Sequence, residues 1–255
     1  MPPAPITPIA TLAELEEACG GEEIVLWTAQ DLRPGVRAWR CGAAVAVAAP
    51  GVCARDRIAV HTAPANSAQA QAQAEAEAAR LARHAAAECG PTYRLFGEAG
   101  LITRLAGPER PATVFSWMST RTPPPRPAGA HWLEPALDTQ VAALLADHHP
   151  GSYATPGMPG VHRWAGARHD GALAAVAADA WSTRATGFLA GVATAAHARG
   201  HGLARRVCAF VTAELLTTRR SVALMVDDWN TAAIAVYEHL GYTARPVASA
   251  PPPET

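Results

Sequence analysis

One short loop, RGHGLA at residues 199–204, has the residue types and spacing that suit anion binding. Gly200 and Gly202 allow a tight turn and let a ligand approach the backbone. The loop leads into a helix, whose first N–H groups lack intrahelical partners and, with the helix dipole, suit a pyrophosphate. Arg205 and Arg206 add positive charge. On its own, the loop also fits an ordinary turn between a strand and a helix. It is not a Rossmann fingerprint, because the third small residue is missing.

The second half of the chain supplies strands and helices that position this loop. Asp170-Gly171 between two apolar runs predicts a β-hairpin. A strand at 187–194 precedes the loop, and an amphipathic helix at 202–216 follows it. Asn230 is expected to cap a later helix. The other predicted elements are a strand at 131–134, a helix at 138–148 capped by Asp138, strands at 161–167, 172–180 and 221–226, and a helix end at Gly241.

The second half of the chain contains two short motifs whose order and spacing are more informative together than either motif alone. The loop holds Arg199, Gly202 and Ala204, and the later helix holds Asn230, Ala233, Tyr237, Gly241 and Tyr242. Together they resemble the GNAT superfamily of N-acyltransferases, in which (Q/R)xxGx(G/A) is followed by a helix, a strand and NxxAxxxYxxxGF. The resemblance covers about residues 130–248. It implies an α/β (α+β) fold, a mixed and mostly antiparallel sheet with splayed central strands flanked by helices.

The resemblance also implies where an acyl-coenzyme A donor binds. In the family two parallel strands separate and the pantetheine arm passes between them; here these strands are 187–194 and 221–227. The implied coenzyme A contacts lie on the first strand, in the loop and on the last helix: Val192, Ala193, Thr194, Arg199, Gly200, His201, Gly202, Leu203, Ala204, Arg205, Asn230 and Tyr237.

Three residues are candidates for proton transfer. By resemblance Tyr237 is the general acid, because a phenol with a pKa near ~10 stays protonated and can protonate the departing thiolate; the alternative is a core tyrosine. His148, or its neighbour His149, lies where the family lines its acceptor pocket and is a candidate base; the alternative is a solvated helix end. Asp228, after a buried strand, is a candidate base or amine anchor.

The sequence departs from the family pattern in two places. The family often has Pro-x-aromatic before the arginine, where this chain has Ala196 and Ala198. The family also often carries a glutamate base on the central strand, and the stretch FLAGV at 188–192 has none. Proton removal from the acceptor amine must therefore use a water or another residue near the cleft.

The first half contains no such loop. Strands are predicted at 23–28, 41–49, 57–61 and 112–118, and a helix at 67–89 with Asn66 or Ser67 as its N-cap. Leu81 is the only large apolar residue of that helix, which predicts a mostly solvated helix; a partner-binding helix is the alternative. Strands around one helix suggest a small α/β domain. By resemblance we interpret this half as a degenerate second GNAT domain, so that the fold is tandem.

A proline-rich stretch, TRTPPPRPAG at 120–129, is the clearest seam, because consecutive prolines favour an extended spacer. It divides the chain into four predicted parts. They are a degenerate GNAT-like domain at 1–122, a linker at 123–129, a catalytic domain at 130–248 and a flexible tail at 249–255.

Composition limits the class of protein. The chain has 255 residues, 49% hydrophobic, and a formal net charge of −1, which argues against a nucleic-acid binder. All 21 basic residues are arginines, so a Walker lysine and a Schiff-base lysine are excluded. Five cysteines without a CxxC pair argue against a disulfide framework or a cysteine zinc site. With no recognisable signal peptide or membrane span, we expect a cytoplasmic protein without a metal.

The sequence thus predicts an N-acyltransferase that moves an acyl group, expected to be acetyl, from coenzyme A to the amine of a small molecule. The expected partners are acetyl-CoA and that amine, with an acyl carrier protein as a further candidate, and neither nucleic acid nor membrane. Two alternatives remain. One is the same fold with an acyl-carrier-protein or aminoacyl-tRNA donor in specialised metabolite biosynthesis; the other is a non-catalytic acyl-CoA sensor.

Overall fold

A computed structural model describes residues 4–252 of the chain. In the first part of the chain, apolar residues on both faces of the strands give a sheet that helices cover on both sides. On β3 (Ala44–Val52), Val45 and Val47 pack in one core with helices α1 (Leu12–Ala18) and α2 (Glu23–Thr28). The intervening Ala46 and Ala48 pack in another core with α3 (Ala68–Cys89) and α4 (Ala99–Ala106). Successive side chains of a strand point to opposite faces, so a single strand serves both cores.

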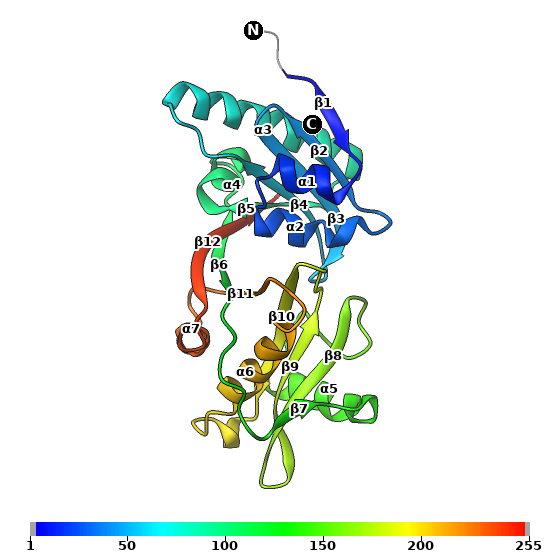
Figure 1. Ribbon diagram of the computed structural model, residues 1–255, viewed down its shortest axis with the longest axis vertical. Helices are drawn as coiled ribbons and strands as arrows, with labels where there is room; N and C mark the ends of the chain where they lie inside the picture. The colour runs from blue at the N-terminus through cyan, green and yellow to red at the C-terminus, as the bar shows by residue number, and fades with distance from the viewer. Residues whose placement is uncertain (1–3, 253–255) are drawn as a thin grey trace. The chain divides into compact units, whose positions relative to one another are not determined.

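The chain forms two units, residues 1–115 with 246–255 and residues 116–245. The strands of the first unit follow the order β1-β2-β3-β4-β5-β12 (Figure 1). All neighbouring pairs are antiparallel except β4 and β5, which run parallel around the crossover helix α3. Their bounds are β1 (Ile6–Ile9), β2 (Arg37–Cys41), β4 (Arg55–Thr62), β5 (Arg94–Glu98) and β12 (Thr243–Ala250).

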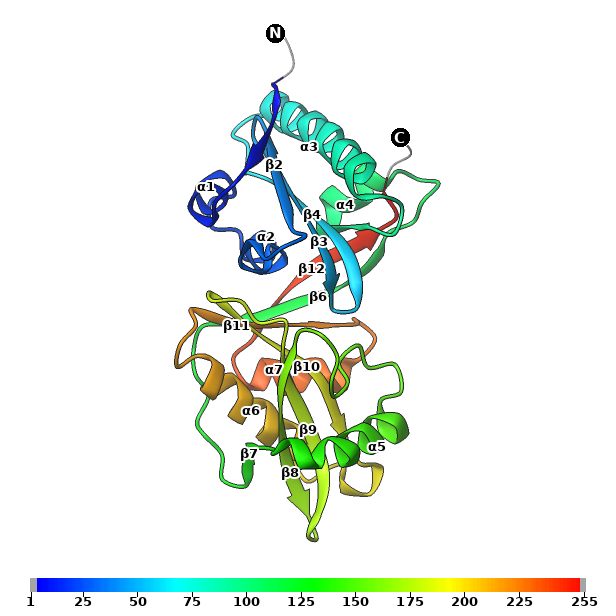
Figure 2. The ribbon, with the colours of Figure 1, turned by 90° about the vertical axis from the view of Figure 1, so that its right-hand side faces the viewer.

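The second unit repeats this plan, with the strand order β6-β11-β10-β9-β8-β7. Only β10 and β11 are parallel, and α6 connects them. Helix α5 covers one face of the sheet, and α6 and α7 cover the other (Figures 1 and 2). Their bounds are β6 (Thr113–Thr120), β7 (Ala130–Trp132), α5 (Asp138–His148), β8 (Val161–His169), β9 (Ala172–Ala180), β10 (Thr186–Thr194), α6 (Leu203–Leu215), β11 (Ser221–Val226) and α7 (Thr231–His239).

Two strands pair within a different unit from the one that holds the segments preceding them in the sequence. Strand β6 follows α4 in the sequence, yet its residues 116–120 pair with β11 of the second unit. Strand β12 follows α7, yet its residues 247–250 pair with β5 of the first unit. The predicted fold is confirmed, namely a tandem α/β fold with mixed, mostly antiparallel strands and flanking helices.

The local predictions of turns and helix ends are confirmed at three places. The Asp170-Gly171 hairpin forms with a positive φ at both residues, +49° and +81°. The Ser67 hydroxyl accepts a hydrogen bond from the Ala70 amide at 3.2 Å and starts α3, as predicted. Gly241, with φ of +84°, follows the end of α7.

Four predictions were wrong. Residues 23–28 form helix α2 instead of a strand, because the Glu22 side chain caps it and burial of one helical side outweighs β propensity. A turn at Gly42, with φ of +57°, splits 41–49 between β2 and β3. Helix α3 is not mostly solvated, since a face of small residues around Leu81 is buried. Asp138 is the first residue of α5 and not its N-cap, which is Leu137 without a side-chain hydrogen bond.

The unit boundaries differ from the predicted domain boundaries. Residues 116–129 belong to the second unit, although the sequence predicts domain 1 to run to residue 122 and a linker after it. Arg126 in the proline-rich segment forms an ion pair with Glu214 of α6 at 2.7 Å, which fixes this segment against the helix. Residues 249 and 250 of the predicted tail lie in β12, and residues 253–255 lie outside the described residues. Between residues 4 and 252, no helix is both long and apolar enough to cross a bilayer.

Candidate functional site

The two parallel strands of the second unit separate partway along their length. Paired positions are Thr186 with Ser221, Gly187 with Val222 and Phe188 with Ala223, after which no further pair joins the described residues of the two strands. Both strands nevertheless continue, β10 to Thr194 and β11 to Val226. Backbone groups on this edge of β10 are therefore available to an extended ligand that adds like a strand.

A β-bulge lies in the separated part of β10. The register with β9 shifts between Ala190 and Ala193, and Gly191 has a φ of +61°. A Cβ at Gly191 would lie 2.5 Å from Cη2 of the buried Trp164, so only glycine fits beside that ring. Bulges redirect backbone groups of a strand. Here the bulge redirects them in the segment that includes the predicted contacts Val192, Ala193 and Thr194.

The predicted phosphate loop has the expected geometry. Gly200 and Gly202 adopt φ of +81° and +71°, and Gly202 is the N-cap of α6 without a side-chain hydrogen bond. The first helical bond is donated by Arg206 N to the Gly202 carbonyl at 3.0 Å. In the described chain the preceding amides, those of residues 203–205, have no acceptor. Three N–H groups at a positive helix end form a candidate anion site.

Arg199 and His201 brace this loop with their side chains. Arg199 Nε donates to the Thr194 carbonyl at 3.5 Å, a long bond to the end of β10. The His201 ring lies 3.1 Å from the Arg199 carbonyl through Nδ1, which must be the donor because a carbonyl only accepts. Both side chains therefore stabilise the turn and leave the amides of the loop open to a ligand.

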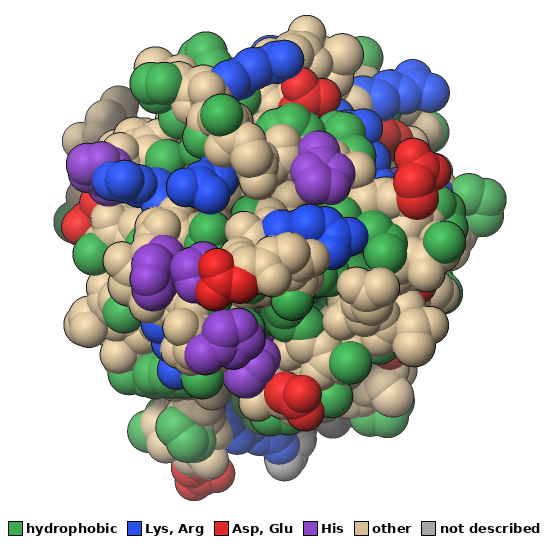
Figure 3. Space-filling model, turned by 90° about the horizontal axis from the view of Figure 1, so that it is seen from below, with side chains coloured by type: hydrophobic (Ala, Val, Ile, Leu, Met, Phe, Trp, Pro, Cys, Tyr) green, Lys and Arg blue, Asp and Glu red, His purple; other side chains and the backbone are tan. Residues whose placement is uncertain are grey.

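Histidines gather beside the loop, although no short pattern in the sequence predicts such a cluster. The His169 ring lies 4.5 Å from the His201 ring and 6.4 Å from the His197 ring, measured between centroids. Figure 3 shows histidine side chains gathered on this face. The hairpin tip brings His169 to the loop, and no short sequence pattern predicts that contact. Within residues 4–252 no group of three metal-binding side chains is arranged to hold a metal ion.

The later helix positions Asn230 and Tyr237 as the sequence predicts locally. Asn230 Oδ1 accepts from the Ala233 amide at 3.2 Å and caps α7. Tyr237 is only 7% exposed, and its burial, with smaller effects from Cys208 and Tyr242, raises the pKa of its phenol well above the usual range. The Tyr242 hydroxyl bonds to Thr212 Oγ1 at 2.7 Å, whereas the Tyr237 hydroxyl has no partner among the described residues.

The candidate bases differ in what they contact. His149 Nδ1 lies 3.2 Å from the Val192 carbonyl, so this nitrogen donates to β10 and a neutral ring presents Nε2 as an acceptor. His148 is half-buried in the last turn of α5 and makes no such contact. Asp228 is exposed and accepts a hydrogen bond from Ser116 Oγ at 2.7 Å. The structure thus brings His149, and not His148, onto the separated strand.

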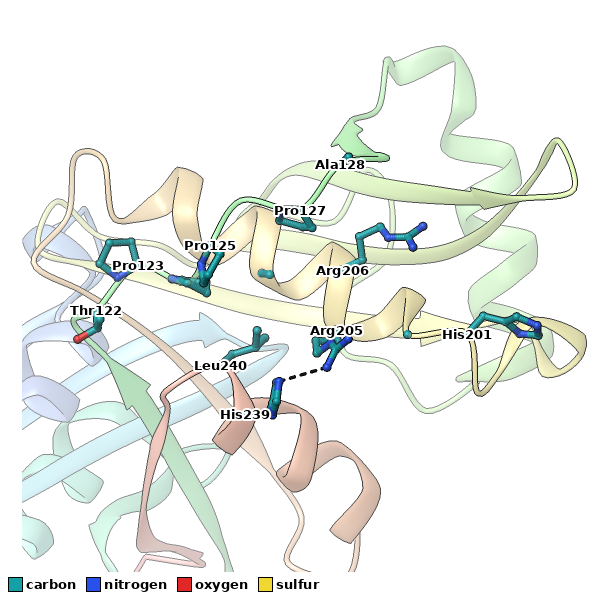
Figure 4. A pocket seen from close by; sticks show the side chains of 13 residues that line it. Thr122, Pro123, Pro125, Pro127, Ala128, His201, Arg205, Arg206, His239 and Leu240 are labelled. Atoms are coloured by element: carbon teal, nitrogen blue, oxygen red, sulfur yellow. Dashed lines mark hydrogen bonds between the residues drawn. The ribbon is translucent and has the colours of Figure 1, made fainter.

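A groove of about 660 Å³ adjoins the loop (Figure 4). Its walls come from the proline-rich segment, the start of α6 and the end of α7. The lining residues are Thr122, Pro123, Pro124, Pro125, Pro127, Ala128, His201, Gly202, Arg205, Arg206, Ala209, His239 and Leu240.

The corresponding place in the first unit lacks these features. Strands β4 and β5 also pair only up to Ala59 and Phe96, but the Phe96 ring stacks on Phe115 at 6.1 Å and lies 4.7 Å from the Arg57 guanidinium. The connection at 63–67, APANS, has no glycine or arginine, and Ser67 itself caps α3. Side chains thus pack where the strands separate, and the Ser67 hydroxyl already accepts from one amide at the helix start, that of Ala70.

Comparisons with known proteins agree with this geometry. Residues 165–249 match the family model described as FR47-like protein. No curated protein matches the chain. Among solved structures, a GNAT-family acetyltransferase from Colwellia psychrerythraea is 15% identical with a TM-score of 0.55, covering 97% of this chain and 99% of that one.

Two further structures show the same fold. A GCN5-related N-acetyltransferase from Kribbella flavida is 18% identical, with a TM-score of 0.54 and coverage of 84% and 88%. One from Sphaerobacter thermophilus is 16% identical, with a TM-score of 0.52 and coverage of 92% and 87%. Identities this low establish the fold and leave substrates open. The chain thus has the fold of GNAT acetyltransferases, and its residues 165–249, with the separated strands and the glycine loop, are similar to the FR47-like family.

Proposed function

We propose that this protein transfers an acetyl group from acetyl-CoA to the amine of a small molecule. The observation that carries the proposal is the separation of β10 and β11 next to three unpartnered amides at the start of α6. The GNAT fold supports N-acyltransferase activity in general, and these features support coenzyme A as the acyl carrier. The comparisons give no support to an acyl carrier protein.

The donor substrate fits these features by its chemistry. Pantetheine contains amides in an extended chain, which match the free edge of β10 along the predicted contacts at 192–194. The pyrophosphate matches the amides of residues 203–205 and the positive end of α6. The bulge at Gly191 lies between the paired start of β10 and these contacts, which is where we place the thioester.

Tyr237 is the proposed acid for the leaving thiolate. The amine attacks the thioester carbonyl, the carbon–sulfur bond breaks, and the sulfur needs a proton or a hydrogen bond. A phenol whose pKa is raised by burial keeps its proton throughout the neutral range. It therefore stabilises the thiolate mainly as a hydrogen-bond donor, and the unpartnered Tyr237 hydroxyl is free for this role.

His149 is the proposed acceptor of the proton that leaves the amine. Its Nδ1–H is held by the Val192 carbonyl of the strand where the donor is expected to bind, which leaves Nε2, on the other side of the ring, free to accept a proton. This arrangement supplies a base in a chain without a glutamate on the central strand. Asp228, which is exposed and bonded to Ser116, remains a candidate for anchoring the amine.

Replacing Tyr237 by phenylalanine is expected to lower kcat by roughly 10²-fold with little change in acetyl-CoA affinity. The substitution removes one hydroxyl that has no partner among the described residues, so stability should hold. Steady-state kinetics with thiol detection and calorimetry measure the two quantities. Tyr242→Phe is the matched control, because it loses a hydroxyl bonded to Thr212 and should keep kcat. Wild-type turnover in Tyr237→Phe would reduce Tyr237 to a packing residue.

Replacing His149 by alanine is expected to lower kcat by roughly 10²-fold while leaving acetyl-CoA affinity nearly unchanged. The neighbouring His148→Ala variant is the control, since no hydrogen bond joins that side chain to the described residues of β10. A larger loss in His148→Ala than in His149→Ala would reverse the assignment.

A non-catalytic sensor is the rival function, and release of free thiol with any amine acceptor would exclude it.

A further inference from the structure

We propose that the contact between Arg205 and His239 couples binding of the acyl-CoA donor to pH, with His239 taking up a proton from the solvent as the donor binds. The coupling rests on the proposed function, because the bound anion is the pyrophosphate at the amides of residues 203–205. The device is a proton-sensitive hydrogen bond between α6 and α7, which holds the Arg205 side chain in the free protein.

The hydrogen bond exists only while the His239 ring is neutral. Arg205 Nη1 lies 3.1 Å from His239 Nε2, and Figure 4 draws this contact as a dashed line. A guanidinium has donors and no acceptor, so Arg205 donates and Nε2 accepts. The proton of the neutral ring is therefore on Nδ1. A protonated ring would carry a hydrogen on Nε2 as well, which removes the acceptor and places two positive charges side by side.

The groups of α6 and of the loop that face this pair are basic. Arg206 lines the same groove as Arg205 and His239, and its side chain makes no hydrogen bond or ion pair with the described residues. His201 lies in the same wall, and its Nδ1 is already engaged by the Arg199 carbonyl. A positive charge on His239 would therefore lie among other basic side chains.

Acidic groups that could balance such a charge do not line the groove. The proline-rich segment contributes prolines, a threonine and an alanine to the lining, none of which titrates. Arg126 of that segment is paired with Glu214 of α6 at 2.7 Å, so these two charges compensate each other. Glu238, next to His239 on α7, is exposed and forms no ion pair within residues 4–252. In the free protein, a charge on His239 thus has no anionic partner.

A bound pyrophosphate changes this balance. Arg205 supplies one of the three open amides at the start of α6, so its side chain begins at the anion site itself. By turning to the anion, its guanidinium exchanges a neutral acceptor for a charged one, which gives a stronger hydrogen bond. His239 Nε2 is then released, and the negative charge of the ligand favours its protonation in the range where histidine titrates. Donor affinity should therefore rise as the pH falls, until His239 is protonated in the free protein as well.

Titration calorimetry of the full chain with 3′-dephospho-coenzyme A tests this coupling. The probe carries the pyrophosphate without the phosphate monoester, whose own second proton would titrate near pH ~6. In PIPES, MES and Bis-Tris at one pH, the measured heat changes with the ionisation heat of the buffer in proportion to the protons taken up. We expect an uptake of roughly half a proton per ligand at pH ~6.5, and an affinity roughly 3–10-fold higher at pH ~6 than at pH ~8.

His239→Gln is the test variant, because a glutamine oxygen still accepts from Arg205 but does not titrate. It should bind the probe with less than half of the wild-type proton uptake and with an affinity that is nearly independent of pH. His131→Gln is the matched control, because His131 is exposed on β7 outside the groove lining and should keep the wild-type uptake. His201→Asn replaces the other histidine of the groove and should keep the uptake per bound ligand.

The outcomes separate this coupling from the proposed function. Binding of the probe by wild type without proton uptake would overturn the coupling and leave the acyl-CoA donor intact. Uptake that persists in His239→Gln, or that is lost in His201→Asn, would overturn the assignment to His239. If circular dichroism shows that His239→Gln is unfolded, His239→Asn repeats the test. Failure of wild type to bind either the probe or coenzyme A would overturn both proposals.

Discussion

Replacing Gly202 by valine is expected to weaken coenzyme A binding by roughly 10²-fold or more while the protein stays folded. Gly202 has a φ of +71°, where a β-branched residue is strained, and it starts the helix whose amides form the anion site. A Cβ there would meet no protein atom closer than 3.9 Å, so the added methyl groups would occupy ligand space and not the core. Loss of two charge-assisted amide bonds accounts for the expected change in affinity. Isothermal titration of both proteins measures it.

Gly21→Val is the matched control for this experiment. Gly21 has a similar φ of +76° and no neighbour within 4 Å, but it lies in an exposed turn of the first unit. It carries the same backbone strain without touching the loop, so coenzyme A affinity should stay at the wild-type level. Wild type should bind one coenzyme A per chain, because Phe96 packs against Phe115 and Arg57 where β4 and β5 of the first unit separate. A binding site that survives in Gly202→Val would show that the first unit is not degenerate.

A fragment of residues 116–245 is expected to fold and bind coenzyme A, whereas a fragment of residues 125–245 is not. The two differ by nine residues that include the part of β6 paired with β11. Trp117 and Met118 in this segment are fully buried, and the Trp117 ring lies 5.7 Å from Phe188 on β10. Loss of two such side chains costs about 3–5 kcal/mol each, comparable to the whole stability of a domain.

Circular dichroism, thermal melting and titration with coenzyme A compare the two fragments. The full chain is the reference for affinity, and the longer fragment should match it closely because it contains the whole candidate donor site. A soluble, cooperative 125–245 fragment that binds coenzyme A would show that β11 does not need β6.

The sequence predicted what depends on neighbouring residues. The hairpin at Asp170, the cap at Asn230 and the glycine loop each need only a few positions in a row, and each forms as expected. The strand and helix order of the second half follows from the same local patterns, because its apolar periodicity is clear. The assignments of individual residues to donor contacts and catalysis stay predictions.

What the sequence could not predict depends on contacts between distant residues. The pairing of β6 with β11 joins residues about a hundred positions apart. The sequence of neither strand indicates which other strand it pairs with. His149 meets Val192 only because α5 packs on β10. The run at 23–28 has strand-forming residues, but the Glu22 cap and its packing against β3 and β4 make it a helix. Tertiary context decided all three.

The pairing of β12 with β5 implies a delay during synthesis between the two strands that pair. Residues 247–250 are made about 150 residues after β5, which ends at Glu98, yet they cover an edge of that strand. At a synthesis rate of roughly 5–20 residues per second, the ribosome needs roughly 8–30 s to supply the covering strand. During that interval β5 exposes an unpaired edge of the kind that promotes aggregation. Nascent chains that stall before residue 246 should therefore be preferred clients of chaperones and proteases.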